Sequence, residues 1–275
     1  MRYGDTYPPP LPLLEIAPQL EDALGAVLVP TFGVPVYPRP LDYLYAHVER
    51  ALDAHEDAIR AHADEVTPFI FSPGLETVPD EKTDEVTPYW NNEYFTPGDA
   101  RLAYAVVARY RPRRIVEVGC GNSTRFMRRA ARDVGLGTRI TCIDPDPRED
   151  IRLVADEVRV ERLQDADPSV FEGLAANDVV FFDGSHLVLN GSDCTCFFLE
   201  VLPRLPKGIW VHVHDIFLPY DYPYRLFVDC RSNEQYMMAL LVLFSREWLP
   251  ALPIYYAHRK GWLPHGGGSF WMRRV

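Results

Sequence analysis

Residues 114–124, RIVEVGCGNST, join a short apolar run to a glycine-rich turn and the first residues of a helical pattern. The apolar run predicts a strand that is covered on both faces, as in parallel sheets between layers of helices. Gly119 and Gly121 let the backbone turn tightly and approach a ligand. The free N–H groups of the following helix can bind an anion. The stretch therefore predicts a strand, a ligand-contacting turn and a helix.

The same alternation of strands and helices continues to the end of the chain. Further strands are predicted at 139–144, 158–163, 178–183 and 208–214, followed by an antiparallel hairpin of 252–258 with 268–275. Helices are predicted from Thr96, which is a good N-cap, and at 123–133, 148–156, 193–204 and 233–245. We therefore expect an α/β fold, a Rossmann-like, doubly wound and mostly parallel seven-stranded sheet with an antiparallel C-terminal hairpin.

The N-terminal third of the chain has a different composition. Residues 1–40 are rich in proline and predict an irregular arm, and 41–64 have the spacing of an amphipathic helix. A polar, Pro-rich linker comes next, which contains Asp-Glu-Val-Thr-Pro at 64–68 and again at 84–88. We expect two parts, an extension of arm, helix and linker (1–95) and the α/β domain (96–275).

Composition excludes several classes of protein. The chain has 275 residues, of which 47% are apolar, and a formal net charge of −11. Such an acidic chain lacks the basic surface that general nucleic-acid binding requires. We expect no membrane span, because no apolar run approaches about eighteen residues. The N-terminus does not have the layout of a signal peptide, and the five cysteines form no zinc-binding pattern, so we predict a cytoplasmic protein with reduced thiols.

Polar residues stand at the carboxyl ends of the predicted strands, where open α/β sheets bind their ligands. In chain order these residues are Glu117, Asp144, Gln164 with Asp165, Asp183 with His186, and His214 with Asp215. Asp144 is placed to accept both hydroxyls of a ribose. A dinucleotide site needs a third glycine where Thr124 stands, whereas Glu117 suits a ligand with an ammonium group. The ligand that fits is a nucleoside joined to an amino acid.

Four motifs in this order, VEVGCGNST, CID, FFDGSH and VHVHDIFLPYDYP, resemble class I S-adenosylmethionine-dependent methyltransferases. They look like the branch with D-G-S-H and H-D motifs on adjacent strands. The resemblance implies that Glu117, Gly119 and Gly121 line the methionine end of the cofactor, with Ser123 in place of a further glycine. It also implies that Asp144 holds the ribose and that Gln164 or Asp165 edges the adenine. Asp183, His186, His214 and Asp215 are then expected around one cleft.

Three interpretations of the histidine-rich strand end remain open. Asp183, Asp215 and one imidazole could bind a divalent ion that orients the acceptor oxygen. Alternatively, His186 or His214, oriented by a carboxylate, takes the acceptor proton during methyl transfer. The third interpretation is structural, with the His-Asp pair fixing the loop. The base interpretation is favoured, because related enzymes that bind magnesium have an acid where His214 stands and Mg²⁺ prefers oxygen ligands.

The sequence predicts an S-adenosylmethionine-dependent methyltransferase that acts on an oxygen of a small molecule or short peptide, in specialised metabolism. The alternatives are a nicotinamide-dependent Rossmann oxidoreductase and a cofactor-binding protein without turnover. The acceptor wall is expected from Tyr94, Phe95, Tyr220, Tyr222 and Tyr224, residues that could instead pack the extension onto the domain. The acceptor, the methylated atom and the oligomeric state, with a dimer among the alternatives, stay open.

Overall fold

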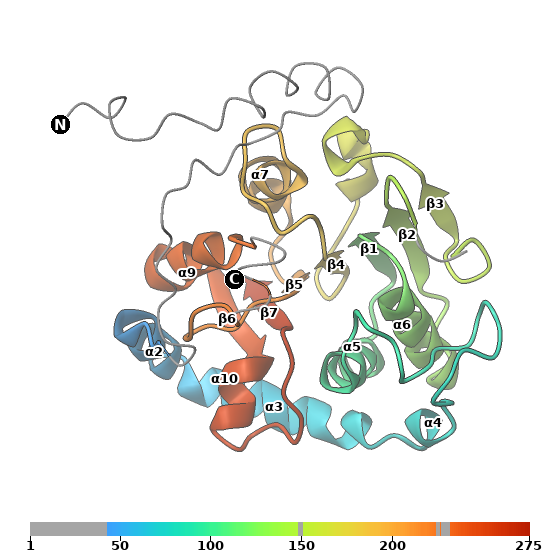
Figure 1. Cartoon of the computed structure of the whole chain (residues 1–275), viewed down its shortest axis with the longest axis horizontal. Helices are drawn as coiled ribbons and strands as arrows, with labels where there is room; N and C mark the ends of the chain where they lie inside the picture. The colour runs from blue at the N-terminus through green and yellow to red at the C-terminus, as the bar shows by residue number, and fades with distance from the viewer. Residues whose placement is uncertain (1–42, 148–150, 224–225, 227–231) are drawn as a thin grey trace, which may run out of the picture. The chain divides into compact units, whose positions relative to one another are not determined.

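The computed structural model describes residues 43–147, 151–223, 226 and 232–275. Leu41–Val275 forms one compact unit, and Figure 1 shows its elements. Its described residues contain a seven-stranded sheet of order β3-β2-β1-β4-β5-β7-β6. The strands are β1 (Arg114–Val118), β2 (Arg139–Ile143), β3 (Glu157–Arg159), β4 (Val179–Phe182), β5 (Trp210–Val213), β6 (Trp248–Pro253) and β7 (Phe270–Arg274).

The strands β1 to β5 are parallel to one another, and β7 is antiparallel to both of its neighbours, β5 and β6. β7 lies between β5 and β6, so β6 forms the edge of the sheet. The central strands are mostly apolar and buried, as Val116, Val180 and Val211 show. Both faces must therefore be covered, which is the arrangement that a parallel sheet requires. The expected fold class is confirmed.

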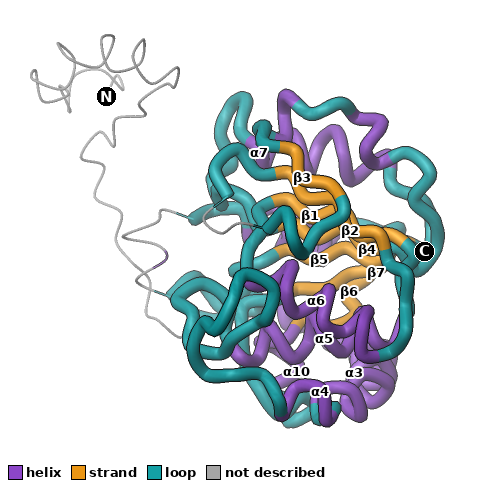
Figure 2. The backbone as a smooth tube through the Cα atoms, turned by 90° about the vertical axis from the view of Figure 1, so that its right-hand side faces the viewer, coloured by secondary structure: helices purple, strands orange, loops and turns teal. Residues whose placement is uncertain are grey.

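The helices cover the two faces of this sheet. They are α2 (Ala46–Asp53), α3 (Glu56–Ile70), α4 (Pro73–Glu76), α5 (Pro97–Tyr110), α6 (Asn122–Asp133), α7 (Asp193–Cys196), α9 (Gln235–Phe244) and α10 (Ile254–Arg259). Shorter turns are η1 (Leu163–Asp165), η2 (Pro168–Phe171), η3 (Phe197–Val201) and η4 (Leu202–Arg204). Figure 2 shows α5 and α6 side by side on one side of the sheet and α7 on the other. Aromatic stacking fixes both layers, with ring centroids 4.2 Å apart for Tyr110 and Trp210 and 4.1 Å apart for Phe182 and Phe197.

The predicted hairpin is correct in orientation and wrong in its first strand. The segment expected as strand 252–258 is mostly the helix α10, and the strand that pairs with β7 is β6, which begins at Trp248. Two prolines, Pro250 and Pro253, argue against a strand in the sequence. They are tolerated because β6 is an edge strand, where missing N–H donors can face away from the partner.

Several other boundaries also differ from the sequence-based expectation. The helix expected at 41–64 is two helices that meet at Ala54 and His55, and the second continues to Ile70. The first Asp-Glu-Val-Thr-Pro copy is therefore helical rather than linker. The described part of the helix expected at 148–156 forms turns, and β3 is shorter than predicted. The arm of residues 1–40 lies outside the described residues, and the functional division between 95 and 96 stays a prediction.

Two expectations from composition can be compared with the described residues. Four cysteines, Cys120, Cys142, Cys194 and Cys196, are free thiols, as predicted. Within the described ranges, no helix has the length and apolar character to cross a membrane.

Candidate active site

The glycine turn after β1 packs tightly on one side and is open on the other. Gly119 has φ +76°, and a Cβ at this position would lie 1.8 Å from the carbonyl oxygen of Asp183. The backbone N–H of Asp183 in turn donates to the carbonyl of Val118 over 2.9 Å. At Gly121, by contrast, no atom of the described residues lies within 4 Å of a Cβ. The turn is thus fixed against β4 and leaves free space at Gly121.

Glu117 holds the start of α6 from beneath the turn. One of its carboxylate oxygens accepts a hydrogen bond from the Ser123 hydroxyl over 2.5 Å, and the other accepts one from Thr124 over 2.6 Å. The side chain is fully buried. Burial raises the pKa of Glu117 to about 8, against the opposing effect of the two hydroxyl donors. The hydroxyl groups that replace glycine in this motif therefore bind the carboxyl group directly.

Asp144 lies on the other side of the same turn. Its Oδ2 accepts from the backbone N–H of Cys120 over 3.0 Å, and its Oδ1 accepts from that of Asp146 over 2.9 Å. Each oxygen can accept a further hydrogen bond. Asp144 and Asp183 thus flank one glycine turn, as the strand-end rule predicts.

Gln164 and Asp165 lie on η1 and are exposed. The Gln164 side chain donates to the carbonyl of Gly191, in the loop after β4, over 3.1 Å. Asp165 forms an ion pair of 2.6 Å with Arg162. Neither residue contacts the glycine turn in the hydrogen bonds of the described residues, so their role at the adenine stays a prediction.

The four residues predicted around one site do come together after β4 and β5. His186 Nε2 lies 3.4 Å from Asp183 Oδ1 and 3.8 Å from Asp215 Oδ2. His214 Nε2 lies 3.7 Å from Asp215 Oδ1. Asp215 therefore has an imidazole near each of its oxygens.

Glu234, immediately before α9, completes this cluster, and sequence reasoning missed it. Its carboxylate binds Nδ1 of His186 and is almost fully buried. Burial alone would lower the pKa of His186, but the negative charges of Glu234, Asp183 and Asp215 raise it to about 10. His186 is therefore an imidazolium at neutral pH. A glutamate next to an apolar helix is common, so the sequence carries no signal that distinguishes Glu234.

The backbone at the two central positions is in the left-handed region. His186 has φ +62° and Asp215 has φ +54°. Neighbouring segments hold both residues, because Asn233 N–H donates to the His186 carbonyl over 2.9 Å and Ile216 N–H donates to the Gly268 carbonyl over 2.7 Å. Residues that keep this conformation at a cost in free energy concentrate at functional sites.

The two histidines of β5 and its end have different surroundings. His212 is fully buried, its Nε2 lies 3.0 Å from the Ser269 hydroxyl, and burial holds its pKa well below the usual range. His212 is thus a core histidine. His214 is also buried, and its Nδ1 has no hydrogen-bond partner among the described residues. Burial would lower its pKa, but nearby carboxylates, Asp183 first among them, raise it.

Asp99 is a second buried acid close to the cluster. It lies in the first turn of α5, where an acid complements the helix dipole, and it is also fully buried and accepts from the backbone N–H of Ser269 over 2.8 Å. A Cβ at Gly267 would lie 2.4 Å from the Asp99 carboxylate. The glycine-rich segment before β7 therefore wraps directly around Asp99.

The expected aromatic wall is only partly in the interior. Phe95 is buried with its ring centroid 5.4 Å from that of His214, and Tyr222 is buried too. Tyr94 is exposed, and Tyr220 packs under the guanidinium of Arg259. Tyr224 lies outside the described residues.

Residues 116–216 match a family model described as a methyltransferase domain. The match begins in β1, includes the glycine turn and the loop after β4, and ends next to Asp215. The predicted methyltransferase resemblance is confirmed. The matched segment thus contains all of the cofactor-binding and catalytic residues predicted from the sequence, but none of the predicted acceptor wall. No curated protein sequence matches the chain.

Several solved structures are similar to this chain over most of its length. An S-adenosylhomocysteine-bound methyltransferase from Podospora anserina is 16% identical, with 87% of this chain and 100% of that chain covered and a TM-score of 0.44. An O-methyltransferase from Bacillus cereus is 14% identical, with 95% and 97% covered and a TM-score of 0.39. The O-methyltransferase TomG from Streptomyces achromogenes is 14% identical, with 86% and 92% covered and a TM-score of 0.40. At these values the likenesses carry no argument about activity.

Proposed function

We propose that the chain is an S-adenosylmethionine-dependent methyltransferase that methylates an oxygen of a small molecule or short peptide, in specialised metabolism. The observation that carries the proposal is the position of Asp144 and Asp183 on either side of one glycine turn. The methyltransferase family match covers the same residues.

The residues around the glycine turn fit S-adenosylmethionine. Asp144 would bind the ribose hydroxyls, since both of its oxygens keep acceptor capacity. The free space at Gly121 would admit the amino-acid end, and Glu117, with Ser123, would shape the turn beneath it. Gln164 and Asp165 would edge the adenine. When bound, the cofactor supplies a methyl group on a positively charged sulfur.

On the acceptor side, the protein must align the acceptor oxygen and provide a group that takes its proton. His186 is already protonated at neutral pH, so it cannot take the proton of an acceptor hydroxyl. Asp215 is better suited, because burial raises its pKa and so makes its carboxylate a stronger base. His186 and His214 would hold Asp215 in place through its two oxygens. Phe95 would help exclude water at His214.

The extension is proposed to form the acceptor side. The part of the extension just before α5 contacts α6 directly. Asn122, the first residue of α6, donates to the Tyr89 carbonyl over 2.7 Å. Arg125, which is fully buried, forms an ion pair of 3.3 Å with Glu85. The segment before α5 therefore lies next to α6, the helix that follows the glycine turn.

The proposal requires no divalent ion. Within the described residues, no group of three His, Cys, Asp or Glu side chains is arranged to hold a metal. Two of the polar groups closest to Asp215 are imidazoles, whereas magnesium prefers oxygen ligands. Activity that survives exhaustive EDTA treatment would agree with this, and activity restored only by added Mg²⁺ would contradict it.

Calorimetric titration with S-adenosylhomocysteine tests the cofactor. We expect binding by the wild type and at least about tenfold weaker binding by Asp144→Ala, because charge-assisted hydrogen bonds to the ribose are lost. Asp146→Ala is the matched control, since its backbone N–H still binds Asp144. No binding to the wild type at millimolar ligand would overturn the proposal.

A further inference from the structure

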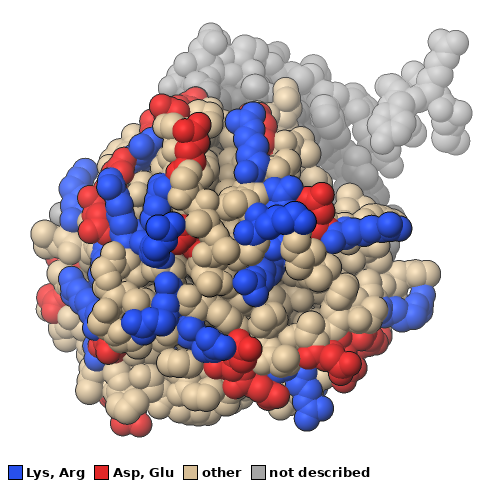
Figure 3. Space-filling model, turned by 180° about the vertical axis from the view of Figure 1, so that it is seen from behind, with Lys and Arg blue, Asp and Glu red and all other residues tan. Residues whose placement is uncertain are grey.

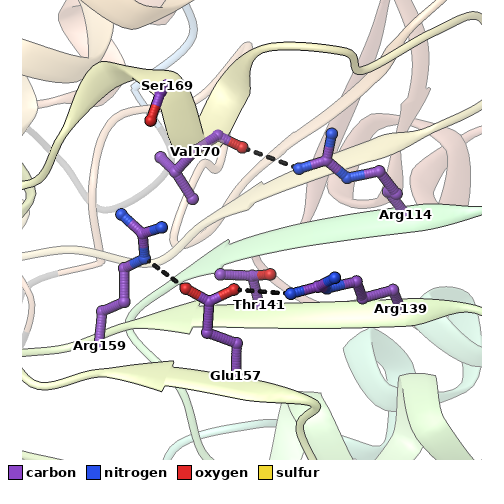
Figure 4. A pocket seen from close by; sticks show the side chains of 7 residues that line it. All are labelled: Arg114, Arg139, Thr141, Glu157, Arg159, Ser169 and Val170. Atoms are coloured by element: carbon purple, nitrogen blue, oxygen red, sulfur yellow. Dashed lines mark hydrogen bonds and ion pairs between the residues drawn. The ribbon is translucent and has the colours of Figure 1, made fainter.

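A cavity of about 380 Å³ lies away from the strand ends described above. It is lined by Arg114, Arg139, Thr141, Glu157, Arg159, Ser169 and Val170 (Figure 4). Arg114, Arg139 and Glu157 are the first residues of β1, β2 and β3. The cavity is therefore near the amino ends of these strands, opposite the carboxyl ends that carry Asp144 and Asp183.

Strand register explains why this cavity is polar. Arg114 pairs with Arg139 on β2, and Thr141, two residues further along β2, pairs with Glu157. Because side chains alternate along a strand, all four side chains point to the same face of the sheet. A parallel sheet normally buries apolar side chains on both faces. Here the amino half of that face carries charged and hydroxyl groups, and the segment above it forms only the short turns η1 and η2.

The cavity wall has an excess of positive charge. Arg139 and Arg159 both pair with the Glu157 carboxylate, at distances of 3.1 Å and 2.8 Å, and Arg159 also lies 3.9 Å from the carboxylate of Glu161, which is not part of the lining. Arg114 donates instead to two backbone carbonyls, those of Glu172 over 2.6 Å and Val170 over 3.0 Å. The lining thus contains three guanidinium groups and one carboxylate, in a chain of net charge −11. Figure 3 shows that basic side chains are spread across the rear face despite that net charge.

We propose that this cavity binds a phosphate-bearing small molecule. The guanidinium groups of Arg139 and Arg159 suit a phosphate because their planar donors match its oxygens in pairs. Arg114 adds positive charge, and the hydroxyls of Thr141 and Ser169 add neutral donors. The volume is within the range of small-molecule sites, so a phosphate ester fits better than a bare ion.

Calorimetry on the full chain, with S-adenosylhomocysteine present at saturating concentration, tests the proposal. The probes are inorganic phosphate, pyrophosphate and ribose 5-phosphate. Arg139→Gln and Arg159→Gln are each expected to weaken binding about tenfold, because a charge-assisted hydrogen bond is lost. Glu157→Gln is expected to strengthen binding, since the carboxylate that competes with the ligand for both guanidinium groups is then removed. Arg246→Gln removes an exposed arginine next to β6, at the other edge of the sheet, and should change nothing.

The opposite signs expected for the arginine and glutamate variants separate a binding effect from a folding defect. Lack of binding of all probes at millimolar concentration would overturn the proposal, as would equal affinities for wild type, Arg139→Gln and Glu157→Gln. Inorganic phosphate that binds as tightly as ribose 5-phosphate would overturn the assignment to an ester. No methyl transfer is measured, so failure here leaves the proposed methyltransferase activity untouched.

Discussion

The charge state of His186 depends on one buried neighbour, Glu234. Glu234→Gln removes the negative charge from Nδ1, so we expect the pKa of His186 to fall from about 10 toward its ordinary value of 6.5. Because the raised pKa belongs to the folded state, its stabilising effect is complete below pH 6.5 and is lost as the pH rises through about 10. The variant should therefore lose about 2 kcal/mol near pH 6 and less at pH 10.

NMR titration of the His186 ring checks the pKa, and chemical denaturation at the two pH values checks the stability. Glu200→Gln is the control, since Glu200 is an exposed glutamate on η3. A His186 titration curve that does not move in Glu234→Gln would show that Glu234 does not set its charge.

The two glycines of the turn after β1 should respond differently to the same added methyl group. Gly119→Ala is expected to cost at least about 2 kcal/mol, because φ is positive and the Cβ would overlap the Asp183 carbonyl. Gly121→Ala should change stability by less than about 0.5 kcal/mol, yet weaken S-adenosylhomocysteine binding by filling free space. Thermal unfolding and calorimetry measure the two effects.

Gly137→Ala is the control for this pair, since no atom of the described residues lies within 4 Å of its Cβ and it is far along the chain from the turn. If Gly121→Ala bound S-adenosylhomocysteine like Gly137→Ala, the space at Gly121 would not belong to the cofactor.

Among the individual site residues, those at the strand ends were predictable from the order of the strands in the chain. Asp183, His186, His214 and Asp215 come together because the carboxyl ends of adjacent parallel strands share one edge. Glu234 could not be found this way, because it reaches the cluster from the start of α9 and not from the end of a strand. Asp99 carries an N-terminal helix signal in the sequence, and only the three-dimensional contact with Ser269 shows that it is buried.

Among the helices, α5 begins at a cap that the sequence predicts. Thr96 accepts a hydrogen bond from the Asp99 N–H over 3.4 Å and donates to its carboxylate over 2.5 Å. Thr96→Ala should therefore lower the free energy of unfolding by about 1 kcal/mol. Urea denaturation measures the loss, with Thr83→Ala in the exposed loop before α5 as control. Equal midpoints for the two variants would contradict the role of the cap.

The elements that were mispredicted are those in which local preference and tertiary position disagree. Ile254, Tyr255 and Tyr256 favour a strand by composition, but they come after Pro253, which suits the start of a helix. Thr67 donates to the Ala63 carbonyl over 2.7 Å inside α3, one turn before its end, and this helix continues through Pro68. A proline usually ends a helix, so the sequence alone predicted a linker there.

Stability of the whole molecule should decrease on the alkaline side. Glu117 has a folded-state pKa of about 8 against an ordinary value of 4.5, and His186 has about 10 against 6.5. Each group therefore binds its proton more tightly in the folded state. The stabilisation is complete below the ordinary value and is lost as the pH rises through the folded value.

We expect the melting temperature, measured by circular dichroism, to fall between pH 6 and pH 10. Glu117→Gln should flatten the part of this fall below about pH 8 and leave the part above it. A melting temperature that rises steadily over this range would contradict both pKa shifts.

For the whole molecule, the fold class was predictable because five apolar strands alternate with helical patterns in one chain segment. The parallel order β3-β2-β1-β4-β5 is the one expected for a doubly wound sheet. The order of the last two strands is not, since nothing local in Phe270–Arg274 indicates that this strand inserts beside Trp210. Charged side chains on one face of β2 and β3 were equally unexpected for strands of this kind.

The insertion of β7 between β5 and β6 has a kinetic consequence. β6 precedes β7 in the chain, yet its only neighbour in the described sheet is β7. It can enter the sheet only after β7 has docked, or together with it as a preformed ribbon. Docking of β7 on β5 must close a long intervening segment, and such distant pairings form slowly. β6 therefore cannot join the sheet before β7, although it comes first in the chain, and the slowest step in refolding is expected at this edge.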